Sequence, residues 1–189
     1  MASKITWGGL AGIATAVLLL LSAIINQLSP MQQTYDSAAS YLYLVIVIAG
    51  YLTVIITVRG IHALHARSPR YGRFGTVGSV LTIVGYAIVA IVRVISMVQG
   101  QASLLTLRLV GAAAILVGSA LLGVIILRAR LLPWWCGVLL IVAFPLGHFA
   151  NEIFSPSEQL LMALLWGSMG IALLVRRQAV TESMASQPA

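Results

Sequence analysis

The chain has 189 residues, of which 60% are hydrophobic and only 8% charged, and its formal net charge is +7. These proportions exclude a soluble globular domain of this size and predict a chain that lies in a lipid bilayer. The positive charge does not indicate nucleic-acid binding, because the cations flank apolar stretches rather than aromatic or glycine-rich segments. We expect anionic lipid headgroups on the cytoplasmic side as the counter-charge.

The first apolar stretch, Ile5–Leu28, resembles a secretory signal peptide in its position. Its length is nearer the roughly 20 residues of a membrane span than the roughly 7–15 of a signal's apolar core, and no clear small-residue cleavage site follows. We therefore interpret it as the first transmembrane helix. The later stretches predict spans at Ser40–His62, Gly75–Val98, Leu104–Leu127, Leu132–Phe149 and Gln159–Val175.

The predicted fold is all-α, a polytopic membrane helical bundle with six transmembrane helices in a single domain, residues 1–177. Residues 178–189 are rich in Thr, Ser, Gln and Pro and have no apolar periodicity. This composition predicts a disordered cytoplasmic tail.

The charged residues alternate between successive loops. Basic residues occupy every second loop or terminus, at Lys4, at Arg59, Arg67, Arg70 and Arg73, at Arg128 and Arg130, and at Arg176 and Arg177. Asp36, Glu152 and Glu158 fall in the loops between. Because positively charged loops are retained in the cytoplasm, we expect both termini there. Short spans joined by Arg-Pro-aromatic turns are common in small bacterial proteins, so we expect a multi-pass protein of the bacterial plasma (inner) membrane.

Small and polar residues form one stripe on each of the first four spans. The stripes are Gly8, Gly12, Thr15, Ser22 and Asn26; Tyr43, Gly50, Thr53 and Thr57; Gly75, Ser79, Thr82, Tyr86 and Arg93; and Arg108, Gly111, Gly118 and Ser119. We expect these stripes to face the bundle interior, since small residues allow helices in lipid to approach closely and hydroxyls bond across the interface.

Two arginines break the alternation of charge. Arg93 and Arg108 each lie about five residues inside the outer end of a predicted span, and an ionisable residue at such depth is a functional candidate. With His148, Asn151 and Glu152 they form a candidate ligand-binding site. The planar guanidinium fork suits the carboxylate or phosphate of an anionic or zwitterionic small molecule or lipid headgroup.

A structural alternative for the two arginines stays open. They could form ion pairs between helices, with Glu152 or Asp36 as partner, or extend to the outer headgroups. In either case they stabilise the bundle and bind no ligand.

Several chemistries are excluded by residue positions. The only lysine, Lys4, is terminal, so a retinal-type Schiff base cannot form within a span. His62 and His65 lie near the cytoplasmic edge and His148 near the outer edge, which argues against a bis-histidine haem or a three-histidine zinc site. His62 and His65 are interpreted as interfacial side chains. The single cysteine, Cys136, excludes an internal disulfide. We expect no metal and no cofactor.

No catalytic motif is identifiable, so we do not expect an enzyme. The leading hypothesis is a non-enzymatic accessory or interaction subunit whose small-residue faces contact a membrane-protein partner or a second copy. The alternative is a binder or transporter of a small molecule or lipid headgroup that uses an outward-facing Arg/His/Glu site. No nucleic-acid partner is expected.

Overall fold

The computed structural model describes residues 2–28, 35, 37–66, 68, 70–100, 104–151 and 157–185, without the side chains of Ala2, His148, Asn151 and residues 178–185. The described chain forms six helices and contains no strand: α1 (Ala2–Leu28), α2 (Ala38–His65), α3 (Gly72–Gln99), α4 (Leu105–Ala129), α5 (Trp134–Asn151) and α6 (Ser157–Ala185). The prediction of an all-α helical bundle is confirmed.

Five of these helices are long and apolar enough to cross a membrane. The exception is α5, whose apolar part, Trp134–Gly147, is shorter. The whole helix has 18 residues, about 27 Å, against a bilayer core about 30 Å thick. The observed helices begin and end within three residues of the predicted spans, except at the end of α6. This is the architecture of a multi-pass membrane protein.

The structure differs from the prediction at the end of α6. The predicted span ends at Val175 and a disordered tail was expected from Gln178, but the helix continues to Ala185. The lack of apolar periodicity in this segment does not prevent it from forming a helix. Gln, Ala, Glu and Met favour helix, no glycine or proline interrupts them, and a helix that has already formed extends without a new nucleation cost. Residues 186–189 of the predicted tail lie outside the described residues.

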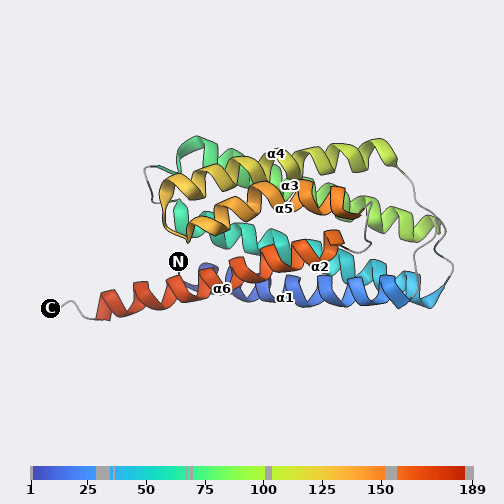
Figure 1. The fold of residues 1–189 in the computed structure, drawn as a ribbon, viewed down its shortest axis with the longest axis horizontal. Helices are drawn as coiled ribbons and strands as arrows, with labels where there is room; N and C mark the ends of the chain where they lie inside the picture. The colour runs from blue at the N-terminus through green and yellow to red at the C-terminus, as the bar shows by residue number, and fades with distance from the viewer. Residues whose placement is uncertain are drawn as a thin grey trace.

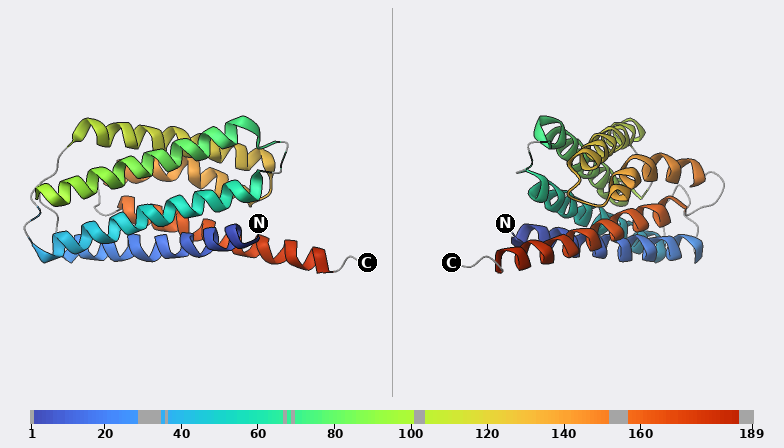
Figure 2. Two further views of the ribbon diagram at one scale, coloured as in Figure 1. Left: turned by 180° about the vertical axis from the view of Figure 1, so that it is seen from behind. Right: turned by 60° about the vertical axis from the view of Figure 1, so that its left-hand side comes forward.

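The six helices form two layers of three. Figures 1 and 2 show α1, α2 and α6 on one side and α3, α4 and α5 on the other. In each layer the central helix, α1 or α4, contacts both of its neighbours, and contacts of α2 with α3 and of α5 with α6 join the layers into a closed ring. Both chain ends lie at one end of the bundle (Figure 1). We call this the basic end, because its described residues include Lys4, Arg59, Arg70, Arg73, Arg128, Arg130, Arg176 and Arg177.

Glycine contacts hold the first layer together. A Cβ added at Gly8 would lie 2.6 Å from the Cα of Gly60 in α2, and one added at Gly12 would lie 2.8 Å from the Cα of Gly170 in α6. A hydrogen bond also joins α1 to α2, because the Thr15 hydroxyl donates to the Thr53 hydroxyl at 2.8 Å. The predicted stripe of α1 therefore faces the interior, and its glycines allow direct backbone contact.

Glycine contacts also hold the second layer together. A Cβ at Gly118 of α4 would lie 2.5 Å from the backbone nitrogen of Thr82 in α3, and one at Gly123 would lie 2.6 Å from the carbonyl oxygen of Gly137 in α5. Gly118 and Thr82, which belong to the predicted stripes of α4 and α3, thus meet inside the bundle. The partner glycine on α5 was not part of any predicted stripe.

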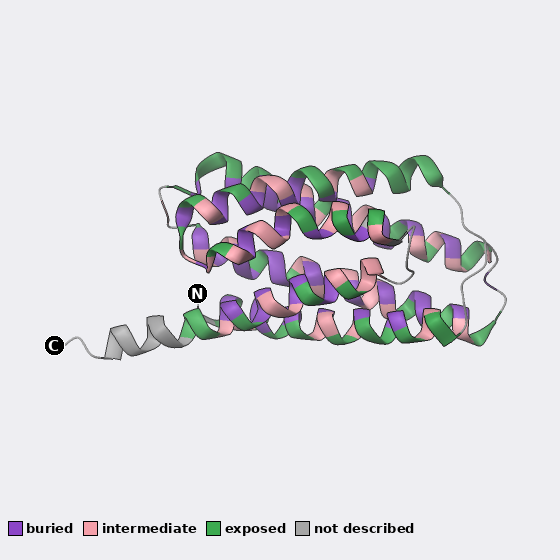
Figure 3. Ribbon diagram, viewed as in Figure 1, coloured by how far each residue is buried: buried purple, intermediate pink, exposed green. Residues whose placement is uncertain are grey.

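The outer faces of the helices are apolar. Large side chains such as Val17, Leu52, Ile91 and Leu164 are more than half exposed, and Figure 3 shows the exposed residues along the outside of the bundle. In a bilayer these side chains contact lipid, which is as apolar as they are. The interior therefore owes its cohesion to close packing and hydrogen bonds.

We predict that Gly118→Ala lowers the stability of the purified protein while Gly50→Ala does not. The new Cβ at residue 118 would meet the α3 backbone, whereas at residue 50 its nearest neighbour, a side-chain carbon of Leu19, is 3.6 Å away. Overpacking of this kind costs about 1–3 kcal/mol. Thermal unfolding in one detergent, followed by tryptophan emission, measures both; equal melting temperatures for the two variants would contradict the glycine-contact interpretation.

Candidate functional site

A cavity of about 310 Å³ lies between the two layers, in the half of the bundle away from the basic end. This volume is at the lower end of the range for small-molecule sites, about 300–1,000 Å³. All six helices contribute to its lining, which comprises Leu19, Tyr43, Val47, Tyr51, Val54, Tyr86, Val89, Arg93, Leu105, Arg108, Leu109, Ala112, Ile115, Phe144, Glu158, Gln159, Met162 and Trp166.

Arg93 enters the cavity from α3. It lies six residues before the end of the helix at Gln99, about 9 Å along the axis. One terminal nitrogen of its guanidinium donates to the Tyr35 hydroxyl at 3.4 Å, and the Tyr35 backbone N–H donates to the Gly100 carbonyl at 2.8 Å. The Nε atom is buried and has no partner within the described part of the chain. The guanidinium thus has one buried donor that is unused.

Arg108 reaches the same cavity from α4. Because α4 begins at Leu105, Arg108 lies in its first turn, about 5 Å along the axis. The sequence had suggested that the two arginines lie at equal distances from their helix ends. In the structure these distances differ. The side chain of Arg108 is exposed. Both arginines line one cavity, where Arg93 is half-buried and Arg108 is exposed.

The first turn of α6 supplies two further polar groups. Gln159 donates from Nε2 to the Tyr43 hydroxyl at 3.3 Å, while its Oε1 is buried and unpartnered among the described residues. Glu158 also lines the cavity, and its Cα would lie 3.2 Å from a Cβ at Gly147 of α5. The absence of a side chain at Gly147 lets this turn approach α5 closely.

Three residues of the predicted site cannot be compared with it. The side chains of His148 and Asn151, and all of Glu152, lie outside the described residues, as does Asp36. The ion pairs of Arg93 and Arg108 with Glu152 or Asp36 therefore stay a prediction. Arg93 and Arg108 are the two members of the predicted site that the structure places beside one cavity.

Sequence reasoning identified only Arg93 and Arg108 among the lining residues, and Glu158 and Tyr51 are two of those that it missed. Glu158 was assigned to a loop because the sixth span was predicted to begin at Gln159, one residue later. Tyr51 was overlooked because only small and polar residues were followed. Tyr43 and Tyr51 are eight residues apart on one face of α2, and that spacing of two aromatic residues was the available signal.

An aromatic group closes the inner end of the cavity. Tyr51 of α2 and Tyr86 of α3 have ring centroids 5.5 Å apart, and Tyr86 meets Trp166 of α6 edge to face at 6.0 Å. The indole N–H of Trp166 donates to the Tyr86 hydroxyl at 3.3 Å. These three side chains connect the two layers at mid-bundle.

Beyond this group the bundle is tightly packed. Leu122 and Ile126 of α4, Leu140 of α5, and Met169 and Leu173 of α6 are each no more than 1% exposed. Their side chains fill the space towards the basic end. The cavity therefore ends at mid-bundle and does not continue to the basic end.

Of the two histidines near the end of α2, His65 packs inside the bundle, which differs from the expected interfacial position, and His62 is half-buried. His65 is fully buried and stacks on Tyr71, with centroids 5.6 Å apart. The Tyr71 hydroxyl bonds with His62 Nδ1 at 3.1 Å and with the Ser79 hydroxyl. Burial raises the pKa of Tyr71, so its hydroxyl keeps its proton. These contacts fasten the turn between α2 and α3.

The described side chains contain no group of three or more His, Cys, Asp or Glu residues placed to hold a metal ion. No family model, curated protein or solved structure matches this chain. The arguments for function therefore come from the cavity itself.

We predict that Tyr86→Phe destabilises the bundle by about 0.6–1.7 kcal/mol, the range for polar contacts between transmembrane helices. The variant leaves the buried indole N–H of Trp166 without its acceptor and shifts tryptophan emission. The matched control is Tyr41→Phe, since Tyr41 is 42% exposed on the outer face of α2. Thermal unfolding of both variants in the same detergent tests this; an equal change in the two would refute a special role for the Tyr86 hydroxyl.

Proposed function

We propose that this multi-pass membrane protein binds an amphipathic anion, an apolar chain or ring system with one carboxylate or phosphate group, in the cavity between its two layers. The observation that carries the proposal is that Arg93 and Arg108 line a pocket whose other walls are mainly apolar and aromatic. Sites of this composition, mainly apolar with a few convergent polar groups, are typical of small-molecule binding.

The charges around the cavity favour an anion. The described residues of its lining include two arginines and one glutamate, Glu158, so their side chains together carry one net positive charge. Arg93 has an unused buried donor, and Arg108 is exposed. A carboxylate or phosphate between them gains charge-assisted hydrogen bonds that are stronger away from bulk water.

The apolar part of the cavity favours an amphiphile over a small polar ion. Below the arginines the wall consists of side chains such as Val54, Val89, Ile115 and Met162, and it ends at Trp166. An apolar chain placed there leaves water or lipid for a packed environment, while its charged group stays beside the guanidiniums.

The blind end of the cavity favours binding over passage through the bundle. This supports the ligand-binding alternative over the accessory role that was expected from the lack of catalytic motifs. The accessory role, with a membrane-protein partner or a second copy, stays a prediction.

We also propose that the basic end faces the cytoplasm of a bacterial plasma membrane, so that the cavity lies in the outer half of the bundle. The support is the positive charge at the end where both termini lie, since such loops are retained on the cytoplasmic side.

Binding can be measured by quenching of Trp166. A variant that keeps Trp166 as its only tryptophan, with Trp7, Trp134 and Trp135 replaced by Phe, is placed in phosphatidylcholine nanodiscs and titrated with ω-bromoundecanoate. We expect saturable quenching, and affinity about 10- to 100-fold lower in Arg93→Gln, because a hydrogen bond to a charged group contributes about 1.5–3 kcal/mol. Arg176→Gln, a change of equal charge at the basic end, should leave the titration unchanged.

Two further arms test this assignment. The neutral analogue ω-bromoundecanol should quench more weakly than the carboxylate, and Ala112→Phe should abolish saturation by filling the cavity while leaving the melting temperature unchanged. Equal quenching by the two analogues, or saturation retained in Ala112→Phe, would show that the probe reaches Trp166 only through the lipid phase.

The role of Glu158 distinguishes an anionic from a zwitterionic ligand. Glu158→Gln removes the one carboxylate of the described cavity lining and should tighten binding of ω-bromoundecanoate by removing repulsion. The same titration is repeated with a zwitterionic analogue that carries an added ammonium group. If the wild type binds this analogue more tightly than Glu158→Gln does, the ammonium binds Glu158, and this result would contradict a purely anionic ligand.

A further inference from the structure

Three arginines surround a surface hollow at the basic end, far from the cavity. Arg70 comes from the turn between α2 and α3, whereas Arg128 and Arg130 come from the end of α4, and with Leu127 they line the hollow. A terminal nitrogen of Arg70 donates to the backbone carbonyl of Arg128 at 3.3 Å. Two chain segments that are distant in sequence thus bring three guanidiniums together.

The backbone around the hollow has a defined geometry. Arg130 ends α4 in the left-handed conformation, with φ +55°, and its N–H donates to the carbonyl of Ile126 at 3.0 Å. Because Arg130 caps the helix in this way, its side chain and that of Arg128 are presented on a fixed turn.

The charges in the hollow are unbalanced. All three arginines are exposed, and no carboxylate is among the described residues that line the hollow. Three like charges side by side repel one another, and an anion bound between them relieves this repulsion. Each guanidinium also offers a planar pair of donors that matches a phosphate.

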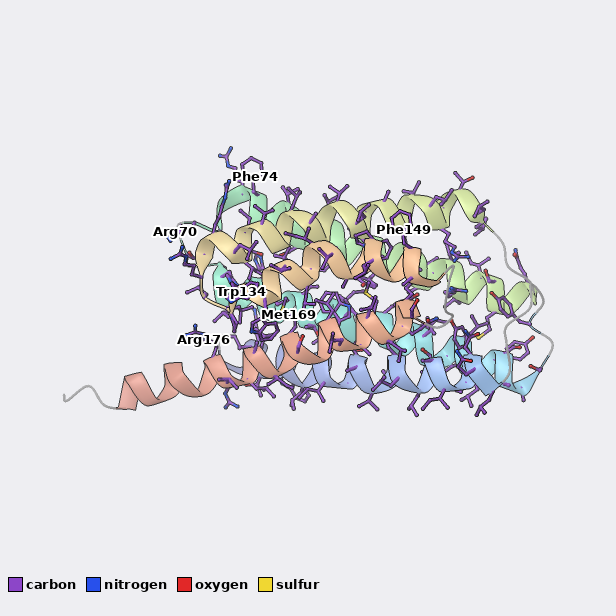
Figure 4. All side chains as sticks on the ribbon, viewed as in Figure 1. Arg70, Phe74, Trp134, Phe149, Met169 and Arg176 are labelled. Atoms are coloured by element: carbon purple, nitrogen blue, oxygen red, sulfur yellow. The ribbon has the colours of Figure 1, made fainter. Side chains whose placement is uncertain are left out.

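Exposed aromatic side chains place the hollow beside the bilayer. Phe74 at the start of α3 and Trp134 at the start of α5 are each 70% exposed, and Figure 4 shows both at the same end of the bundle as Arg70. Aromatic side chains of this kind mark the level of the lipid headgroups. A ligand in the hollow can therefore keep its phosphate among the arginines and its acyl chains in the membrane.

We propose that Arg70, Arg128 and Arg130 form a binding site for the phosphate headgroup of an anionic phospholipid. A headgroup with two phosphates fits three guanidiniums best, because each phosphate can accept from more than one fork. The flanking Phe74 and Trp134 favour a membrane lipid over an anion dissolved in the aqueous phase. This site is separate from the cavity and does not depend on the ligand proposed for it.

Native mass spectrometry of the full chain, titrated with cardiolipin against a phosphatidylcholine background, tests the proposal. We expect one cardiolipin to bind per chain. In the variant Arg70→Gln/Arg128→Gln/Arg130→Asn the affinity for cardiolipin should fall on the order of 100-fold. This estimate takes about a fivefold loss for each basic residue removed near a lipid surface. Asn is chosen at residue 130 because it tolerates the left-handed conformation.

The matched control removes three positive charges from the other layer at the same end. Lys4, Arg59 and Arg176 are exposed there, and Lys4→Gln/Arg59→Gln/Arg176→Gln should keep cardiolipin affinity within about twofold of the wild type. An equal loss in the two triple variants would overturn the proposal, since the attraction would then come from diffuse charge. The single variant Arg70→Gln changes the fold least, and its affinity for cardiolipin should fall about fivefold.

A titration with inorganic phosphate distinguishes a phospholipid headgroup from a phosphate dissolved in the aqueous phase. At concentrations equal to those of cardiolipin, inorganic phosphate should neither bind nor displace the lipid. Displacement by inorganic phosphate, or the absence of one-to-one cardiolipin binding to the wild type, would overturn the assignment to a phospholipid.

Discussion

Backbone-to-backbone contact between helices is the constraint on which this structure depends. In lipid the outer apolar side chains gain little by associating, so the helices must be held by close packing and a few hydrogen bonds. Gly8 against Gly60 and Gly12 against Gly170 bring α1 into direct contact with both neighbours. Gly118 and Gly123 do the same for α4. Each layer is built around one glycine-bearing central helix.

The cavity follows from this division into layers. The contacts between the layers, α2 with α3 and α5 with α6, are less extensive than those of α1 with α2 and α6 and of α3 with α4. Large side chains fill the space between the layers at the basic end. Towards the opposite end the layers enclose the cavity that Arg93, Tyr51 and Tyr86 line.

The arginines of the two proposed sites differ in their exposure to water. Arg93 lies in a cavity beside apolar and aromatic walls, where a single anion is held by few but strong contacts. Arg70, Arg128 and Arg130 are exposed, so water weakens each of them and only their combined charge gives useful affinity. A ligand of the cavity needs an apolar body that fits a closed volume, whereas a ligand of the hollow can keep its chains in the surrounding bilayer.

The sequence by itself determined the apolar spans, the alternation of charge and the interior stripe of α1, because these follow from local composition and helical period. It also singled out Arg93 and Arg108 as ionisable residues inside spans. It did not reveal that α6 packs on α1, nor that Glu158 and Tyr51 join the arginines in one cavity. Those contacts link residues more than forty positions apart in the chain, and the helical period does not specify which helix lies opposite another. The tertiary structure decided them through the fit of glycine surfaces, which depends on both partners at once.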